Sequence, residues 1–331
     1  MMKLIVVCVI SGSPDRDKFF SSMVNDALFV APLRASTQSS TIAHKIANME
    51  RFVIELRKPD LREKAIHELS RMKELSQELA LLLWNSFGTI AVLLQEVIAI
   101  YPHLSPESLT SAQSTRVCNV LALLTCVASH PDTKMPFLNA NIPLYLYPFL
   151  DTTNKLPHFE NLRLSSLGVI GALVKVSTKE VIGFFLASEI IPLCLRNMEI
   201  GKELTKTVAT LILEKILLDD DGLACVCARP ERFLAVGRVL DKVLENLEYQ
   251  PSNRLLKHLI PCYSRLSQNR WAGNALRTSL PNVFGKPTFI NSLREDPATW
   301  MWAQQLYDNV RDNQVHHGGG NNDIVGSSSA S

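Results

Sequence analysis

Apolar residues recur at three- and four-residue spacing along almost the whole chain between about residue 41 and residue 312. This spacing places them on one face of a helix, and such a face packs against a neighbouring element. Alternating β-branched runs bounded by tight turns, which are typical of strands, are missing from the sequence. The pattern therefore predicts an all-α domain.

Four apolar stretches in this region share a design, with a basic or polar first residue, a long apolar face and a polar turn. They begin at Asn119, Ser165, Ala209 and Lys257, which lie 46, 44 and 48 residues apart. HEAT and armadillo repeats have a period of about 40 to 47 residues and contain two or three helices each. Because such units bury their apolar faces only by stacking, we expect a right-handed superhelical armadillo-repeat solenoid with a concave groove.

Two prolines occur in similar apolar contexts, Pro143 in NIPLYL and Pro192 in EIIPLCLR, 49 residues apart. Proline is tolerated in the first turn of a helix, where its missing N–H would have no intrahelical partner. Each proline is therefore predicted to begin a repeat helix. Farther upstream, Asp60 is predicted to cap a helix, with Glu63 at the capping-box position.

The two ends of the chain differ in composition from the repeat region. Residues 1–40 are predicted to form a disordered arm, residues 41–312 the armadillo-repeat domain, and residues 313–331 a disordered tail rich in Gly, Ser and Asn. The run from Lys3 to Ile10 has the outline of a short secretory signal. Seven cysteines, an odd number scattered among aliphatic residues, instead favour buried thiols in a reducing compartment.

The composition and motifs argue against an enzyme. Of the 331 residues, 47% are hydrophobic. The net charge is only +2, so the protein as a whole has no strong positive potential that would indicate nucleic-acid binding. A phosphate-binding loop, a G-x-S-x-G elbow and a zinc-binding H-E-x-x-H motif are all missing from the sequence. The cluster Asp219-Asp220-Asp221-Gly222 could bind Mg²⁺ but is better read as the turn that ends a helix at Leu218. We expect no catalytic residues, no metal site and no cofactor.

Two features could serve binding, and each has a structural alternative. Nine basic residues near helix starts and turns could form a positive stripe in the groove, or could lie on ordinary solvated faces: Arg163, Arg196, Arg232, Arg238, Arg254, Lys257, Arg265, Arg270 and Arg277. Small residues among large ones, at Gly88 and Ala91 and again within residues 164–172, could seat a partner or pack internal helices.

Several sequence blocks resemble the required-for-cell-differentiation (Rcd) family, which is subunit 9 of the CCR–NOT deadenylase complex. The resemblance extends from about Ile46 to Leu306. It is carried by Trp84-x-Ser86-Phe87-Gly88-Thr89-Ile90, Arg116-Val117-Cys118-Asn119, Leu162-Arg163-Leu164-x-Ser166-Leu167-Gly168-Val169-Ile170-Gly171-Ala172-Leu173-Val174-Lys175 and Lys206-Thr207-Val208-Ala209-Thr210.

The resemblance implies a non-enzymatic armadillo subunit that docks on the NOT scaffold and recruits messenger-RNA regulators, in the cytoplasm and the nucleus. Three sets of site residues are implied. The scaffold contact would use the helix with Phe87, Ala91 and Ile98. A groove for helical peptides of RNA-binding regulators would include Asn161 and Gly168. A basic cleft and tryptophan-pocket region would include Arg232, Arg254 and Trp271.

The sequence departs from animal members of the family at several of these places, as a diverged paralogue would. Asn85 and Asn161 stand where animal members carry histidine and tyrosine, and Trp271 stands where they carry arginine. The alternative function is a single-stranded nucleic-acid-binding module in transcription regulation, based on the arginine stripe. The chain could also form a homodimer through the apolar faces that a stack of repeats exposes at its ends.

Overall fold

The computed structural model describes residues 38–105 and 108–312, which form helices and contain no strand. The predicted tail and nearly all of the predicted arm, including the signal-like run and Cys8, lie outside these residues. By their contacts, the described residues up to Asp219 form one compact unit, and those from Asp220 onward form a second. Each unit is described by itself.

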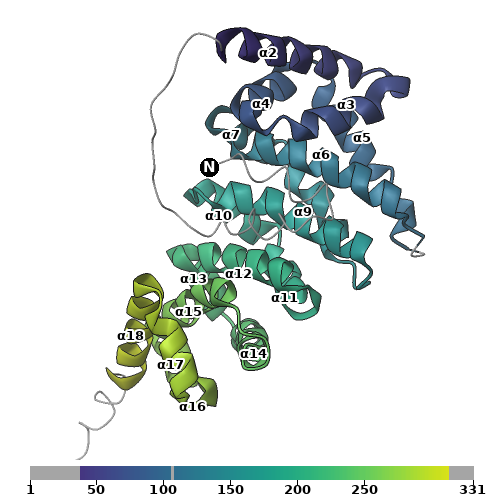
Figure 1. Cartoon of the computed structure of the whole chain (residues 1–331). Helices are drawn as coiled ribbons and strands as arrows, with labels where there is room; N and C mark the ends of the chain where they lie inside the picture. Colours follow the sequence, from purple (N-terminus) through teal and green to yellow (C-terminus); the bar gives the residue numbers. More distant parts are fainter. Residues whose placement is uncertain (1–37, 106–107, 313–331) are drawn as a thin grey trace, which may run out of the picture. The chain divides into compact units, whose positions relative to one another are not determined.

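The first unit contains eleven α-helices and three short 3-10 helices in its described part, and most of the α-helices are labelled in Figure 1. The α-helices are α2 (Gln38–Glu55), α3 (Pro59–Arg71), α4 (Ser76–Asn85), α5 (Thr89–Ile98), α6 (Ser111–Ser129), α7 (Pro131–Asn139), α8 (Tyr147–Leu150), α9 (Pro157–Val174), α10 (Lys179–Ala187), α11 (Ile190–Ile200) and α12 (Glu203–Leu218). The 3-10 helices are η2 (Lys73–Leu75), η3 (Tyr101–His103) and η4 (Ile142–Leu146).

The second unit contains six α-helices and one 3-10 helix among its described residues. They are α13 (Asp220–Cys227), α14 (Pro230–Asn246), α15 (Asn253–Gln268), α16 (Arg270–Ser279), η5 (Asn282–Gly285), α17 (Pro287–Arg294) and α18 (Pro297–Asp312). Helix α15 packs against α16 and α18, and α14 also contacts it. Aromatic rings of Tyr263, Phe284 and Tyr307 meet edge to face beside these helices.

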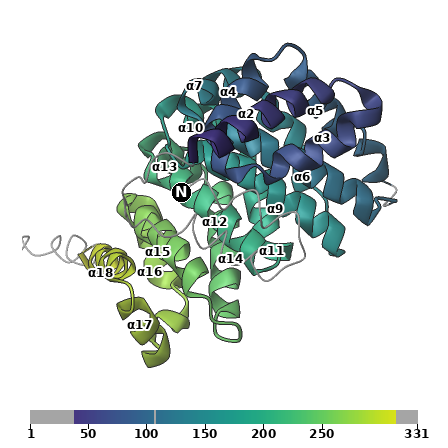
Figure 2. The same ribbon diagram turned by 45° about the horizontal axis from the view of Figure 1, so that its top comes forward.

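Each of the four predicted apolar stretches lies within one long helix, and these helices recur at a regular interval. Helices α6, α9, α12 and α15 begin at residues 111, 157, 203 and 253, which are 46, 46 and 50 residues apart. In the first unit α6 packs on α9 and α9 on α12, and both views show them as successive neighbours (Figures 1 and 2). The stacked repeat of helices predicted from the sequence is confirmed.

The middle helix of this stack is almost completely buried. From Phe159 to Val174 every residue of α9 is buried except Asn161, which is half-buried. Helix α6 is likewise buried from Val117 to Ala128. Because both helices are buried over most of their length, the core of the first unit runs along α6 and α9.

The two matching prolines begin helices, as predicted. Pro143 occupies the first turn of η4, and Pro192 is the third residue of α11. The residues before these helices, Asn141 and Glu189, both have a left-handed backbone, with φ of 56° and 57°. The two repeat units therefore share the backbone conformation of this turn as well as the proline that follows it.

The prediction for the start of α3 is wrong. The helix begins at Pro59, and Lys58 stands at the N-cap without a side-chain hydrogen bond, so Asp60 lies inside the first turn. Proline at the first helical position moves the boundary two residues upstream. A capping box does start α6, where Thr110 Oγ1 accepts from the Gln113 N–H at 3.2 Å and Gln113 Oε1 accepts from the Thr110 N–H at 2.9 Å.

Four of the six described cysteines behave as buried hydrophobic residues. Cys118, Cys126, Cys194 and Cys262 are free and buried, whereas Cys225 and Cys227 are only half-buried. Burial raises the pKa of the Cys126 and Cys194 thiols to about 12, which keeps them protonated and unreactive near neutral pH.

Among the described helices none is by itself long and apolar enough to cross a membrane. Two bent helix pairs, residues 76–103 and 179–200, reach the required length and composition only when taken together.

Candidate interaction sites

The side chain of Phe87 is the most exposed large hydrophobic group in the described part of the chain. It lies in the turn between α4 and α5 and is 90% exposed. Gly88, the next residue, has φ of +75° at the N-cap of α5, and this left-handed backbone favours glycine. Gly88 therefore shapes the turn that presents Phe87.

The three predicted scaffold-binding residues are all exposed. Ala91 and Ile98 lie seven residues apart on α5, hence on one face, and Ile98 is 42% exposed. The prediction that Phe87 belongs to this helix is wrong by two residues, because α5 begins at Thr89. The opposite face of α5 buries Leu93 and Val97, so the helix carries apolar residues on both sides.

The two predicted peptide-groove residues lie on α9, seven residues apart and on the same face. Gly168 is buried, yet a Cβ atom placed on it would meet no heavy atom within 4 Å. Unfilled space therefore lies beside this glycine. Asn161 is half-buried, two turns toward the start of the helix, and its backbone oxygen accepts from Ser165 Oγ at 2.7 Å.

Two of the three residues of the predicted basic cleft, Arg232 and Trp271, lie close to Phe233. Trp271, on α16, is 44% exposed, and its ring meets that of Phe233 edge to face with centroids 4.9 Å apart. Arg232 is the residue before Phe233 on α14. Its Nη1 donates to the Cys225 backbone oxygen at 2.9 Å and lies 2.8 Å from the Cys225 sulfur. Arg254 is half-buried at the start of α15.

Several of the nine basic residues that could form a positive stripe are instead buried or paired within the fold. Arg163 is completely buried. Carboxylates pair with Arg163, Arg196, Lys257 and Arg265. Of the nine basic residues, Arg238 and Arg270 are exposed. Four of the nine basic residues therefore make ion pairs within the fold.

A buried carboxylate that the sequence reading missed connects α9 with α12. Glu160 Oε2 accepts from Arg163 Nη2 at 2.7 Å, and Glu160 Oε1 accepts from the Lys202 N–H and from Thr205 Oγ1, each at 2.7 Å. Lys202 is the N-cap of α12 and has no side-chain cap of its own. Glu160 therefore caps α12 from a neighbouring helix. The spacing of Glu160 and Arg163 was visible in the sequence, but the contact with Thr205, 45 residues away, was not.

Opposing effects act on the ionisation of Glu160. Burial favours the neutral acid, whereas the hydrogen bonds from Arg163, Thr205 and the Lys202 N–H favour the carboxylate. The hydrogen bonds prevail and lower the pKa of Glu160.

A second carboxylate, Glu96 of α5, joins three helices. It accepts from Arg62 Nη1 of α3 at 3.2 Å and from Arg116 Nε of α6 at 2.6 Å. Arg116 Nη1 also meets Glu63 Oε2 at 2.8 Å. Arg116 belongs to one of the blocks that carry the family resemblance, and this network gives it a structural role.

The acidic and other metal-ligating side chains of the described residues are dispersed. In residues 38–105 and 108–312, His, Cys, Asp and Glu side chains do not gather in any group of three that could hold a metal ion. The prediction that α12 ends at Leu218 is correct, but of the acidic cluster only Asp219 lies between the helices, because Asp220, Asp221 and Gly222 form the first turn of α13.

Two curated relatives are similar over most of this chain. Cell differentiation protein rcd1 of Schizosaccharomyces pombe is 52% identical over 261 residues, which are 79% of this chain and 92% of the relative. Protein CAF40 of Saccharomyces cerevisiae is 51% identical over 260 residues, 78% of this chain and 70% of the relative.

Solved structures with low sequence identity share the fold. A designed armadillo repeat protein, solved in complex with the peptide (KR)4, is 12% identical with a TM-score of 0.52, over 79% of this chain and 99% of that chain. An engineered protein is 13% identical with a TM-score of 0.56, over 80% of this chain and 98% of that one. The all-α armadillo solenoid predicted from the repeat is confirmed.

Residues 52–310 match the sequence pattern of one family, which is described as "Cell differentiation family, Rcd1-like". This match covers nearly all of the helical region and agrees with the resemblance found in the sequence. The chain therefore belongs to the Rcd1-like cell differentiation family.

Proposed function

We propose that this protein is a non-catalytic adaptor subunit of the CCR–NOT deadenylase complex. It binds the NOT scaffold on one surface and peptides of messenger-RNA regulators on another, and so promotes deadenylation, decay and translational repression in the cytoplasm and the nucleus. Family membership supports this proposal. The observation that carries it is the exposed apolar set of Phe87, Ala91 and Ile98, with the Phe87 ring 90% exposed, because apolar residues grouped on a surface mark sites of protein–protein interaction.

The scaffold surface consists of Phe87, Ala91 and Ile98. A helix of the scaffold would lay its apolar face on these residues, which lie outside the core formed by Leu93 and Val97. The Phe87 ring would act as the central anchor, since aromatic residues dominate the energy of such interfaces. The peptide surface lies at Gly168, where open space can receive a partner side chain.

The scaffold surface is tested by co-precipitation of a NOT scaffold fragment with purified protein. Phe87→Lys should reduce scaffold binding by tenfold or more, since an interface anchor contributes about 2 kcal/mol or more. Leu234→Lys is a matched control, because Leu234 is also an exposed apolar residue and lies on α14 of the other unit. Undiminished scaffold binding by the Phe87 variant would refute the assignment.

The peptide surface is tested with a second pair of variants. Gly168→Trp should fill the space on α9 and block regulator peptides while scaffold binding continues. The control is Gly183→Trp on α10, where a Cβ also meets nothing within 4 Å and the residue is exposed. If regulator peptides bind the Gly168 variant as tightly as the unmodified protein, the groove lies elsewhere.

A direct nucleic-acid-binding module acting in transcription regulation is the second candidate. The exposed Arg238 and Arg270 and the 44% exposed ring of Trp271 favour it, because single strands bind through cations along the backbone and aromatic rings that stack on bases. The carboxylates that pair with four other members of the stripe weigh against it.

A further inference from the structure

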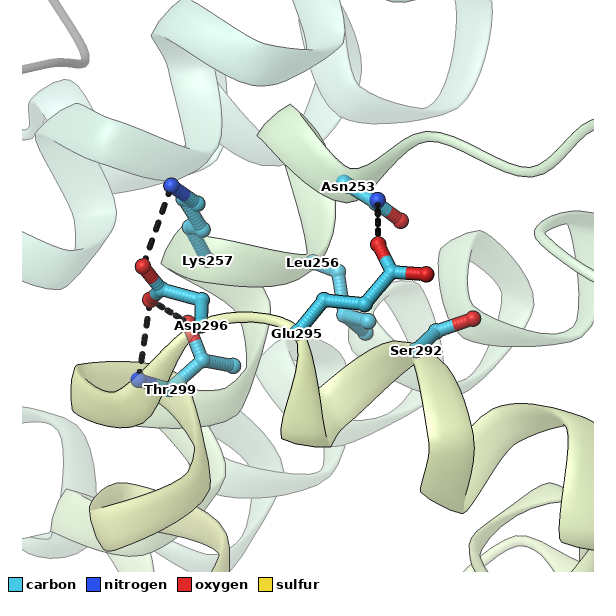
Figure 3. Close-up of a pocket in the computed structure, with 7 residues that line it drawn as sticks. All are labelled: Asn253, Leu256, Lys257, Ser292, Glu295, Asp296 and Thr299. Carbon is cyan, nitrogen blue, oxygen red and sulfur yellow. Dashed lines mark hydrogen bonds and ion pairs between the residues drawn. The ribbon is translucent and has the colours of Figure 1, made fainter.

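A cavity of about 170 Å³ lies in the second unit, between the first turn of α15 and the segment that joins α17 to α18 (Figure 3). Its apolar floor is Leu256, which is buried with 4% of its surface exposed. The side chains around this floor are polar or charged and come from both sides. Arg254, Trp271 and Arg232 do not line it, so it is separate from the basic region described above.

Hydrogen bonds and an ion pair across the cavity fix its polar walls. Asn253 Nδ2 donates to Glu295 Oε2 at 2.7 Å on one side, and Lys257 Nζ meets Asp296 Oδ1 at 3.2 Å on the other (Figure 3). Asp296 Oδ2 also accepts from the Thr299 N–H at 3.0 Å and from Thr299 Oγ1 at 2.5 Å. These contacts hold the two carboxylates in place before any ligand arrives.

The charges around the cavity favour a cation. Asp296 compensates the Lys257 ammonium, whereas Glu295 accepts a hydrogen bond from the neutral amide of Asn253. Hydrogen bonds from Thr299 lower the pKa of Asp296, so this carboxylate stays ionised near neutral pH. The lining therefore carries one negative charge in excess. A phosphate would meet two carboxylates and only one ammonium group, and is disfavoured.

The volume limits the ligand to about one side chain. An engineered cavity of about 150 Å³ holds a benzene molecule, whereas drug-sized ligands need pockets of about 300 Å³ or more. The ligand must also match an apolar floor and a carboxylate at the wall. An arginine side chain has both parts, an aliphatic stem and a planar guanidinium that pairs with carboxylates in a fork.

We propose that this cavity binds an arginine side chain of a basic peptide, with the stem on Leu256 and the guanidinium donating to the carboxylate of Glu295. Lysine fits less well, because its single ammonium group cannot pair in a fork. The site is independent of the scaffold and peptide surfaces on the first unit. It would give the second unit a peptide contact of its own.

The test is an NMR titration of the full-length protein labelled at leucine methyl groups. The probe is a Gly-Arg-Gly peptide that is acetylated at its N-terminus and amidated at its C-terminus. The methyl signals of Leu256 are assigned by their loss in a Leu256→Met variant. These signals should shift as the peptide is added and should reach a plateau. The same peptide with citrulline in place of arginine, which has nearly the same shape but no charge, should leave these signals unmoved. Equal shifts with both peptides would overturn the proposal.

A pair of variants places the binding at Glu295. Glu295→Gln should weaken binding of the arginine peptide by about fivefold, the upper range for a solvent-exposed charge pair. Glu231→Gln, at an exposed carboxylate of the same unit that does not line the cavity, should leave the affinity unchanged. Unchanged affinity in the Glu295 variant would overturn the assignment. Methylguanidinium that binds as tightly as the peptide would overturn the choice of a peptide ligand.

Discussion

At the scale of single residues, the buried side chain of Glu160 illustrates how one carboxylate can replace a local helix cap. The first N–H groups of a helix lack intrahelical partners and favour a negative charge beside them. Lys202 and Glu203, which begin α12, do not supply a side-chain cap, and Glu160 of α9 accepts from the Lys202 N–H instead. Loss of Glu160 would therefore affect two helices and would leave Arg163 buried without its carboxylate partner.

We predict that Glu160→Ala lowers the free energy of unfolding by about 3 kcal/mol, because removing one partner of a buried pair strands the other charge. Urea denaturation monitored by circular dichroism would measure this loss. Glu50→Gln, at an exposed position of α2, is the control and should change stability little. A loss below about 1 kcal/mol would show that the ion pair contributes no more than an exposed one.

The lowered pKa of Glu160 also predicts a pH dependence. Because the folded pKa is below the unfolded value of about 4.3, the ionised carboxylate stabilises the fold above that pH. This contribution declines as the pH falls through the folded pKa. The difference in free energy of unfolding between the unmodified protein and Glu160→Gln should therefore be widest near neutral pH and should narrow as the pH falls through the folded pKa. A gap that stays constant or widens on acidification would contradict the assignment.

Two glycines should respond in opposite ways to alanine. A Cβ at Gly201 would lie 2.6 Å from both the Asn197 backbone oxygen and Thr205 Cγ2, whereas one at Gly168 meets nothing within 4 Å. Gly201→Ala should cost about 1 to 3 kcal/mol through overpacking. Gly168→Ala should be neutral or should gain up to about 1 kcal/mol, because alanine favours a helix interior. Thermal unfolding of both variants under the same conditions measures the two changes in stability. Equal changes in the two variants would contradict the prediction.

At the scale of elements, the turns that lead into η4 and α11 are equivalent but carry different residues. Asn141 and Glu189 both adopt a left-handed backbone, which costs an ordinary L-residue about 1 to 2 kcal/mol and asparagine less. Glu189→Asn should therefore raise the free energy of unfolding by about 0.5 kcal/mol, and the reverse change Asn141→Glu should lower it by a similar amount. Changes of the same sign in both variants would exclude this explanation.

The helices and their repeat could be predicted from the sequence because each depends on local spacing. Apolar periodicity located α6, α9, α12 and α15, and the contexts of Pro143 and Pro192 located two helix starts. The end of α12 at Leu218 also followed from local turn residues. The boundary at Asp60 was missed because Pro59 and Asp60 compete to start the same helix.

The candidate sites could be predicted only in part, because exposure and pairing depend on contacts between distant residues. The resemblance identified Phe87, but periodicity could not show that its ring is 90% exposed in a turn. Arg163 looked like a member of a basic stripe, yet it is buried against Glu160 and bonded to the Asn154 backbone oxygen at 2.6 Å. The cavity beside Leu256 depends on residues about 40 positions apart, which no local pattern connects.

At the scale of the whole molecule, the charge balance decides how strongly the protein can bind nucleic acid. The formal net charge is only +2, and four of the nine basic residues of the stripe pair with carboxylates. Binding to a single strand weakens with salt with a logarithmic slope of about −0.7 for each phosphate that a cation neutralises. The slope therefore reports how many members of the stripe reach the phosphates.

If only Arg238 and Arg270 reach phosphates, raising the salt from about 50 to about 200 mM should weaken binding of single-stranded oligouridine by about sevenfold. A stripe of nine cations would weaken it by several thousandfold over the same range. We expect the small dependence and an affinity weaker than micromolar near physiological salt, measured by fluorescence anisotropy. The double variant Arg238→Glu/Arg270→Glu should abolish the remaining salt dependence. Micromolar binding with a steep slope would instead favour the nucleic-acid-binding module over the adaptor, because a stripe paired within the fold could not release that many counterions.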